Sequence, residues 1–157
     1  PDVLLLIAGE GPALPHLRSL CRSLLLEGNV KFIGYLDRAG ALLDCYRAGD
    51  LFVFASRTET QGLVLLEAMA LGVPVVALAE MGTVDILEPQ RGSVIARCDE
   101  TDFADRVSAL LGSRSVRQEL SAQGVEFAAR WDAAAQAHKL ARLYAGVIKS
   151  GAAQASA

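Results

Sequence analysis

Short, largely apolar runs recur along the chain, and each is followed by a segment with helical periodicity. The runs have the length of single β-strands and lie at 3–8, 30–33, 51–55, 74–78 and 93–96. Between and after them, apolar residues recur every three or four positions, which predicts helices. Strands that are apolar throughout are typical of a parallel sheet covered by helices on both faces. The sequence therefore predicts an α/β fold with a doubly wound, Rossmann-like parallel sheet.

The order of strands and loops also predicts where a ligand would bind. In doubly wound sheets, ligands occupy the crevice beyond the carboxyl ends of the strands. That rule brings four loops to one predicted rim, at 9–12, 34–38, 56–61 and 79–83. Cys45 and Tyr46, on the short helix expected at 39–47, are assigned to the core, and Trp131 is expected to anchor the last helix, 131–148, to the sheet.

Composition and charge exclude several classes of protein. The chain has 157 residues, enough for one domain with a core, of which 52% are hydrophobic and 21% are charged. No apolar run approaches the roughly 20 residues of a membrane-spanning helix. The net charge of −3 argues against broad nucleic-acid binding, which needs a basic surface. An acidic protein can still hold one phosphate group on backbone amides.

The cysteines, the first glycine loop and the chain ends give further expectations. Cys21, Cys45 and Cys98 are widely spaced, so we predict buried free thiols in a reducing cytosol and no metal site. The loop at 9–12 lacks the third glycine of a dinucleotide fingerprint, so no cofactor is predicted.

Since Pro1 leads directly into a strand without an initiator methionine, we expect a piece of a longer protein. We expect a domain at 1–150 and a disordered tail at 151–157.

Two carboxylates, Glu59 and Glu67, lie eight positions apart across a predicted loop and helix. If all of this segment were helical, they would be about 12 Å apart, with about 80° of rotation between them. A hydrolytic pair works at about 5–9.5 Å, so the spacing favours two acceptors that bind different hydroxyl groups of one extended ligand. The amides near Gly62 and Leu63 begin a helix and predict an anion site between them. The alternative is that Glu59 only complements the helix N-terminus and that Glu67 is an exposed helical residue.

A dense string of further residues surrounds these glutamates. It reads Ser56-x-x-Glu59-x-x-Gly62-Leu63-x-x-x-Glu67-Ala68-Met69-Ala70-x-Gly72-x-Pro74-Val75-Val76. The string closely resembles the Glu-x7-Glu signature of retaining GT-B glycosyltransferases of family 4, the glycosyl transferases group 1. Further matches are Leu6–Pro12, Val30-x-Phe32-x-Gly34 and Tyr46-x-Ala48-x-Asp50-Leu51-Phe52-Val53-x-Ala55-Ser56. The resemblance identifies the chain as the C-terminal, donor-binding domain of a GT-B fold.

The resemblance implies a role for each matching position. Glu59 would be the catalytic residue that hydrogen-bonds the donor sugar near the reacting carbon, and Glu67 would bind the ribose hydroxyls. The amides of Gln61, Gly62 and Leu63 would hold sugar hydroxyls and the distal phosphate. The remaining donor-binding candidates are Gly9 and Gly11, with Phe32, Gly34 and Tyr35 near the base.

The chain departs from the family pattern at three places. Gln61 stands where many members carry an aromatic residue, and the string from Thr58 to Gly62 resembles a subgroup that includes lipid-directed glucosyltransferases. The loop at 81–83 has one glycine where the family often has two. The family's cations that neutralise the diphosphate, and its N-terminal acceptor domain, would lie upstream of this chain.

The expected function is therefore that of a hexosyltransferase. Its partners would be a nucleotide-sugar donor, UDP-linked, the acceptor domain of the parent chain, and a glycan or lipid acceptor. No metal would be required, the fragment alone would be inactive, and the location would be cytoplasmic or peripheral on the inner membrane face. A nucleotide-sugar epimerase of the same architecture and a non-catalytic nucleotide-binding module are the alternatives.

Overall fold

The computed structural model describes residues 2–154, with side chains described for 2–148. The chain divides into two compact units, of which the first ends at Cys45 and the second begins at Tyr46. Helix α2 (Ala41–Ala48) crosses this boundary.

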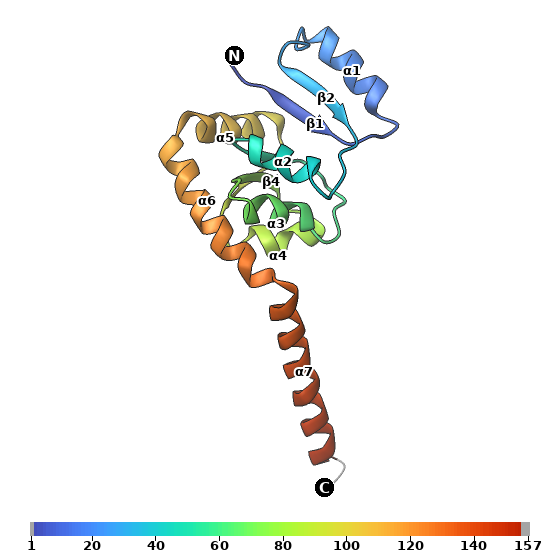
Figure 1. Ribbon diagram of the computed structural model, residues 1–157, viewed down its shortest axis with the longest axis vertical. Coiled ribbons are helices and arrows are strands. Elements are labelled where there is room, and N and C mark those ends of the chain that lie inside the picture. The colour runs from blue at the N-terminus through green and yellow to red at the C-terminus, as the bar shows by residue number, and fades with distance from the viewer. Residues whose placement is uncertain (1, 155–157) are drawn as a thin grey trace. The chain divides into compact units, whose positions relative to one another are not determined.

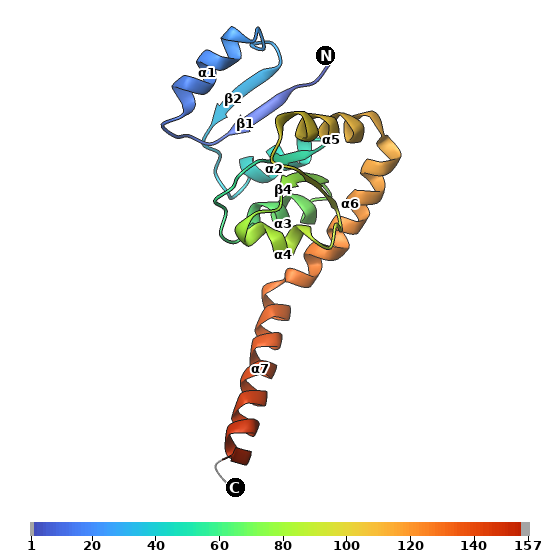
Figure 2. The same cartoon turned by 180° about the vertical axis from the view of Figure 1, so that it is seen from behind.

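The first unit contains a two-stranded parallel sheet. Strand β1 (Leu5–Ala8) and strand β2 (Val30–Gly34) pair in parallel, and helix α1 (Leu14–Ser23) connects them and lies beside them (Figures 1 and 2). Leu5 and Leu6 are both more than a third exposed. Within this unit, one helix on a two-stranded sheet leaves much of β1 uncovered.

The second unit contains a three-stranded parallel sheet in the order β3-β4-β5. Its strands are β3 (Phe52–Phe54), β4 (Val75–Leu78) and β5 (Ser93–Ala96). Its helices are α3 (Leu63–Ala70), η1 (Met81–Thr83), α4 (Val84–Leu87), α5 (Glu100–Gly112), α6 (Arg114–Ala128), η2 (Ala129–Trp131) and α7 (Ala133–Gln154). Every residue of the central strand β4 is buried, as predicted for a parallel strand covered on both faces.

The core of the second unit follows from the alternation of side chains along β4. Val76 and Leu78 lie in one buried cluster with Ala96 of β5 and Leu110 of α5. Because successive side chains of a strand point to opposite faces, Val75 and Ala77 face the other side of the sheet, and both are completely buried. Both views show β4 between α5 on one side and α3 and α4 on the other (Figures 1 and 2).

Helix α3 is the element that carries the predicted anion site. Its sequence, Leu-Val-Leu-Leu-Glu-Ala-Met-Ala, consists almost entirely of strong helix formers. Leu65, Ala68 and Met69 have no exposed surface, and the helix contacts β3, β4 and α6. It ends before Gly72, which has a positive φ of 75°, the conformation that often terminates helices. Packing from three elements therefore fixes the position of the helix N-terminus.

The Rossmann-like α/β fold with parallel strands is confirmed, and the described strands pair as β1-β2 in the first unit and β3-β4-β5 in the second. Two expectations differ from the structure. Trp131 packs edge-on against Phe127 of α6, with ring centroids 6.2 Å apart, and not against the sheet. Among the cysteines, Cys21 is buried and Cys98 is exposed, because Cys98 follows the end of β5 and lies outside the core.

The C-terminal helix also differs from the expectation. Helix α7 continues to Gln154, past residue 151, where the sequence predicted a disordered tail. Alanine and glutamine are good helix formers, which is consistent with this extension. Residues 155–157 lie outside the described part of the chain. Within the described residues, none of the helices combines the length and the apolar character needed to cross a bilayer.

Candidate functional site

The loop between β3 and α3 is shaped by Gly62. This residue has a φ of +69°, a backbone conformation that favours glycine. A Cβ atom at this position would lie 2.8 Å from Cδ1 of Ile86, so a side chain here would also require the end of the Ile86 side chain to shift. The carbonyl of Gly62 accepts a hydrogen bond from the amide of Leu65. The helix therefore begins immediately after the loop, with Leu63.

Glu59 folds back onto the start of this helix. Its Oε1 accepts hydrogen bonds from the amides of Gln61, at 2.9 Å, and Gly62, at 3.0 Å. These two backbone hydrogen bonds lower the pKa of the Glu59 carboxyl group from its usual value. Glu59 is therefore ionised at neutral pH. Such a carboxylate suits the acceptance of hydroxyl hydrogen bonds, or the stabilisation of positive charge, better than the donation of a proton.

The same hydrogen bonds decide which backbone amides are left to bind an anion. The sequence assigned three backbone amides to a ligand. Two of them, those of Gln61 and Gly62, donate hydrogen bonds to Glu59 in this structure. The first N–H groups of a helix have no carbonyl partner within the helix. Leu63 and Val64, the first residues of α3, therefore supply the amides that can face an anion. The ligand roles of all these residues remain predictions.

Gly82, in the loop after β4, contacts the loop that carries Glu59. Its amide donates to the carbonyl of Glu59 at 3.0 Å. A Cβ atom on Gly82 would lie 2.0 Å from the carbonyl oxygen of Thr60 and 2.7 Å from the amide nitrogen of Gln61. Both are backbone atoms, which cannot rotate away. Only glycine therefore permits this close approach of the two loops.

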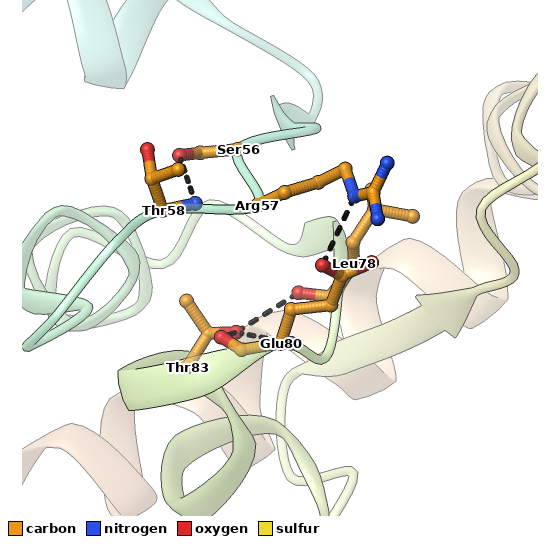
Figure 3. Close-up of polar contacts among 6 residues, drawn as sticks. All are labelled: Ser56, Arg57, Thr58, Leu78, Glu80 and Thr83. Carbon is orange, nitrogen blue, oxygen red and sulfur yellow. Dashed lines mark hydrogen bonds and ion pairs between the residues drawn. The ribbon is translucent and has the colours of Figure 1, made fainter.

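A second contact between the loops is an ion pair at the surface (Figure 3). Arg57 Nε donates to Glu80 Oε2 at 3.1 Å, and the two side chains are 66% and 31% exposed. Beneath it, Thr83 is completely buried. Its Oγ1 accepts from the amide of Glu80 at 2.9 Å and lies 2.9 Å from the carbonyl oxygen of Leu78, to which it can donate. These bonds hold the loop after β4 in the shape that receives the Glu59 loop.

Glu67 lies about one turn into α3 and is half-buried. Its Oε2 accepts a hydrogen bond from the hydroxyl group of Tyr46, at 3.2 Å. Glu67 is thus not the exposed helical residue of the alternative interpretation. Glu59, in contrast, does complement the helix N-terminus, as that interpretation expected.

The glycine candidates of the first unit lie where β1 and β2 end. The amide of Gly9 donates to the carbonyl of Gly34 at 2.7 Å, and their φ angles are +115° and +72°. A Cβ on Gly34 would meet Oε1 of Glu10 at 3.7 Å, whereas Gly9 and Gly11 have open space around them. The two strand ends are therefore joined, and the loop that follows β1 is accessible.

The predicted base region of the first unit contains one aromatic contact. The guanidinium of Arg18 lies 5.8 Å from the ring centroid of Phe32, within the range of a cation–π interaction. Tyr35 is 73% exposed. An exposed tyrosine ring can stack on a planar ligand, but its role as a base contact remains a prediction.

Sequence analysis placed the loop at 79–83 on the predicted rim but named none of Glu80, Gly82 and Thr83 as a site residue, and it assigned Tyr46 to the core. Their relation to Glu59 and Glu67 depends on contacts across 20 residues or more, which local patterns do not encode. The available signals were the rim position predicted for the loop at 79–83 and its single glycine. Among the described residues, no group of three histidine, cysteine, aspartate or glutamate side chains is arranged to hold a metal ion. The prediction of a metal-independent activity is a separate one, and it stays a prediction.

The fold and the site together define a class of protein. Parallel strands end at loops that carry an ionised carboxylate and a helix N-terminus, as in α/β proteins that bind phosphorylated ligands at the carboxyl ends of their strands. The family follows from comparison, since residues 1–127 match the family described as Glycosyl transferases group 1. The chain belongs to this family.

Two curated relatives and one solved structure illustrate the similarity. The chain is 35% identical, over 90% of its length, to D-inositol 3-phosphate glycosyltransferase 2 of Catenulispora acidiphila. It is 34% identical, over 96% of its length, to phosphatidyl-myo-inositol mannosyltransferase of Mycobacterium leprae. The chain spans 34% and 40% of the lengths of these two relatives.

The fold is similar to that of HepE from Anabaena, whose structure was solved in complex with UDP and glucose. The TM-score is 0.80 at 23% sequence identity, and the match covers 93% of this chain and 41% of that one. At this identity the likeness establishes the fold alone.

Proposed function

We propose that this chain is the nucleotide-sugar-binding domain of a retaining glycosyltransferase. The parent enzyme would transfer a hexose from a UDP-linked donor to a hydroxyl group of a glycan or lipid acceptor. Family membership supports transfer chemistry, and the relatives named above are a glycosyltransferase and a mannosyltransferase. The HepE structure contains UDP and glucose, which supports a UDP-linked donor.

The observation that carries this proposal is the anchored carboxylate of Glu59. Two backbone amides fix its Oε1, so the side chain is already ordered before a ligand arrives. Preorganised charge stabilises a transition state without the cost of reorganisation during the reaction. An ionised Glu59 would accept hydroxyl hydrogen bonds of the donor sugar and stabilise the oxocarbenium-like character that develops at its reacting carbon.

The start of α3 suits the other half of the reaction. The positive end of the helix dipole and the amides of Leu63 and Val64 would receive the distal phosphate. The same charge would stabilise the departing diphosphate. Glu67, further along the helix, would accept hydrogen bonds from the ribose hydroxyls. Neither step needs a metal ion.

Isothermal titration calorimetry with UDP-glucose, UDP and GDP-mannose tests the proposal. We expect the folded protein to bind a uridine nucleotide and to bind UDP-glucose more tightly than the Glu59→Gln variant does. Glu88→Gln, a change at an exposed glutamate of the second unit, is the matched control and should leave affinity unchanged. A specific site should bind its ligand with a dissociation constant below about 1 mM. If none of these nucleotides binds at about millimolar concentration, the proposal is refuted.

The two alternatives give different results. In a non-catalytic module, Glu59→Ala would leave nucleotide-sugar affinity unchanged and lower only the stability of the fold. In an epimerase, incubation of the full-length protein with UDP-glucose would yield a changed free nucleotide-sugar without an acceptor. The names of the relatives favour transfer over epimerisation.

The proposal extends to the whole enzyme. Because the chain spans only about a third of its relatives, the acceptor site would lie in a separate N-terminal domain. We propose that the isolated chain binds donor without turnover, and that the parent acts in the cytoplasm or at the inner face of a membrane. Transfer activity of the 157-residue chain alone would contradict the first of these statements.

A further inference from the structure

The hydroxyl group of Tyr46 and the carboxylate of Glu67 meet across 21 positions of sequence. The O···O distance is 3.2 Å, and the contact joins α2 to α3. The tyrosine hydroxyl group donates and Glu67 Oε2 accepts. The sequence assigned Tyr46 to the core, and its side chain is indeed only 8% exposed. Its polar end nevertheless reaches a residue of the proposed site.

The ring that carries this hydroxyl is held by aromatic contacts. Tyr46 packs edge-on against Phe52 of β3, with ring centroids 5.2 Å apart and an interplanar angle of 71°. Phe52 in turn stacks on Phe54 at 6.0 Å. Because both phenylalanines belong to a strand paired with the buried strand β4, the sheet fixes the position of the tyrosine ring.

The hydrogen bond from Tyr46 restrains the side chain of Glu67. A glutamate has three rotatable side-chain bonds, and ordering such a side chain on ligand binding has an entropic cost. The backbone of α3 is fixed by packing, but backbone packing does not select a rotamer. A hydrogen bond from a rigid phenol to the charged group does so, and hydrogen bonds to ionised acceptors are the stronger kind.

We propose that Tyr46 is a positioning residue that orients Glu67 toward the ribose hydroxyls of the nucleotide. The inference rests on the proposed function, since it requires that Glu67 binds ribose. Tyr46 itself does not touch the ligand and acts only through Glu67. Its removal therefore affects the recognition of ribose and leaves the recognition of base and diphosphate intact.

The simpler explanation is that the contact only satisfies a buried hydroxyl group. The two explanations differ in ligand selectivity. If the hydrogen bond is merely structural, its loss changes stability and weakens all nucleotides alike. If it positions Glu67, its loss weakens only ligands that carry ribose hydroxyls.

Tyr46→Phe is the variant of choice because it removes the hydroxyl group and keeps the ring. Calorimetry compares UDP with 2′,3′-dideoxyuridine 5′-diphosphate, which lacks both ribose hydroxyls. We expect UDP to bind the variant about fivefold to tenfold more weakly, as the loss of one hydrogen bond implies, with no change for the dideoxy nucleotide. Tyr144→Phe, at a tyrosine that is 60% exposed on α7, should change neither affinity.

A second measurement tests whether Tyr46 acts through Glu67. In a Glu67→Ala background, the Tyr46→Phe change should have no further effect on UDP affinity, because the side chain that it orients is gone. Urea unfolding of each variant verifies that the measured protein is folded. If Tyr46→Phe is poorly folded at about 25 °C, the full cycle is measured at about 10 °C, near the temperature of maximum stability of most domains.

The outcomes separate this inference from the function on which it rests. If the wild-type protein binds neither nucleotide, the proposed function fails and the inference fails with it. If the wild-type protein prefers UDP and Tyr46→Phe keeps that preference unchanged, only the positioning role is overturned. An equal loss for both nucleotides would also overturn it, in favour of a structural role.

Discussion

The close approach of Gly82 to the Glu59 loop leads to a sharp prediction for Gly82→Ala. The added Cβ would lie 2.0 Å from the carbonyl oxygen of Thr60, whereas ordinary contacts begin at 3.4 Å. One loop must therefore move by roughly 1.4 Å, the difference between these two distances. The movement also strains the hydrogen bond from the Gly82 amide to the Glu59 carbonyl.

The expected magnitude has two parts. Overpacking against atoms that cannot rotate away costs about 1–3 kcal/mol, and loss of the hydrogen bond adds about 1 kcal/mol. A destabilisation of about 2–4 kcal/mol lowers the melting temperature of a chain of this size by about 5–15 °C. Because Glu59 moves with its loop, affinity for a nucleotide-sugar should also fall.

Thermal unfolding and calorimetry with UDP-glucose measure the two effects. Gly40→Ala is the matched control, because a Cβ on Gly40 has no atom within 4 Å, and it should leave both quantities near their wild-type values. If Gly82→Ala melts and binds like the wild-type protein, the two loops do not touch as described, and the support assigned to Gly82 is refuted.

Two further predictions concern the same loops. Because two backbone hydrogen bonds lower the pKa of Glu59, its stabilising contribution is complete above the usual glutamate pKa and is lost as the pH falls through the lowered value. The decrease in urea midpoint between about pH 7 and about pH 3 should therefore be smaller in Glu59→Gln than in the wild-type protein, and an equal decrease would contradict this cause. Thr83→Val keeps the shape of a buried side chain but leaves the amide of Glu80 and the carbonyl of Leu78 without this partner, so it should cost about 1–3 kcal/mol in urea unfolding. Thr101→Val, at an exposed helical position, should change stability by less than about 0.5 kcal/mol, and similar losses in both variants would show that the buried hydroxyl group of Thr83 is not responsible.

Much of the fold could be predicted because the signals are local. Within residues 2–154, the positions of the five strands followed from short apolar runs, and α3 followed from a run of strong helix formers that ends before Gly72. The arrangement of the sheets could not be predicted in the same way. Which strands pair depends on contacts between distant segments, and the described strands form a two-stranded and a three-stranded sheet.

The candidate site shows the same division. Glu59, Gly62 and Glu67 stood out because their spacing matched a ligand and a family pattern, and their roles in ligand binding remain predictions. The bonding of Glu59 to the amides of Gln61 and Gly62 had been one of two open interpretations. Spacing alone could not decide between them, because the conformation of the Gly62 turn determines where those amides point.

The sequence by itself determined the fold class, the family resemblance and the segment that carries the site, since each depends on residue types at short, regular spacings. Only the tertiary structure brought Gly82 against Thr60 and Tyr46 against Glu67. It also placed Trp131 on α6 instead of the sheet. Such contacts join segments that are distant in sequence, and they arise only when the packing of strands and helices fixes which side chains become neighbours.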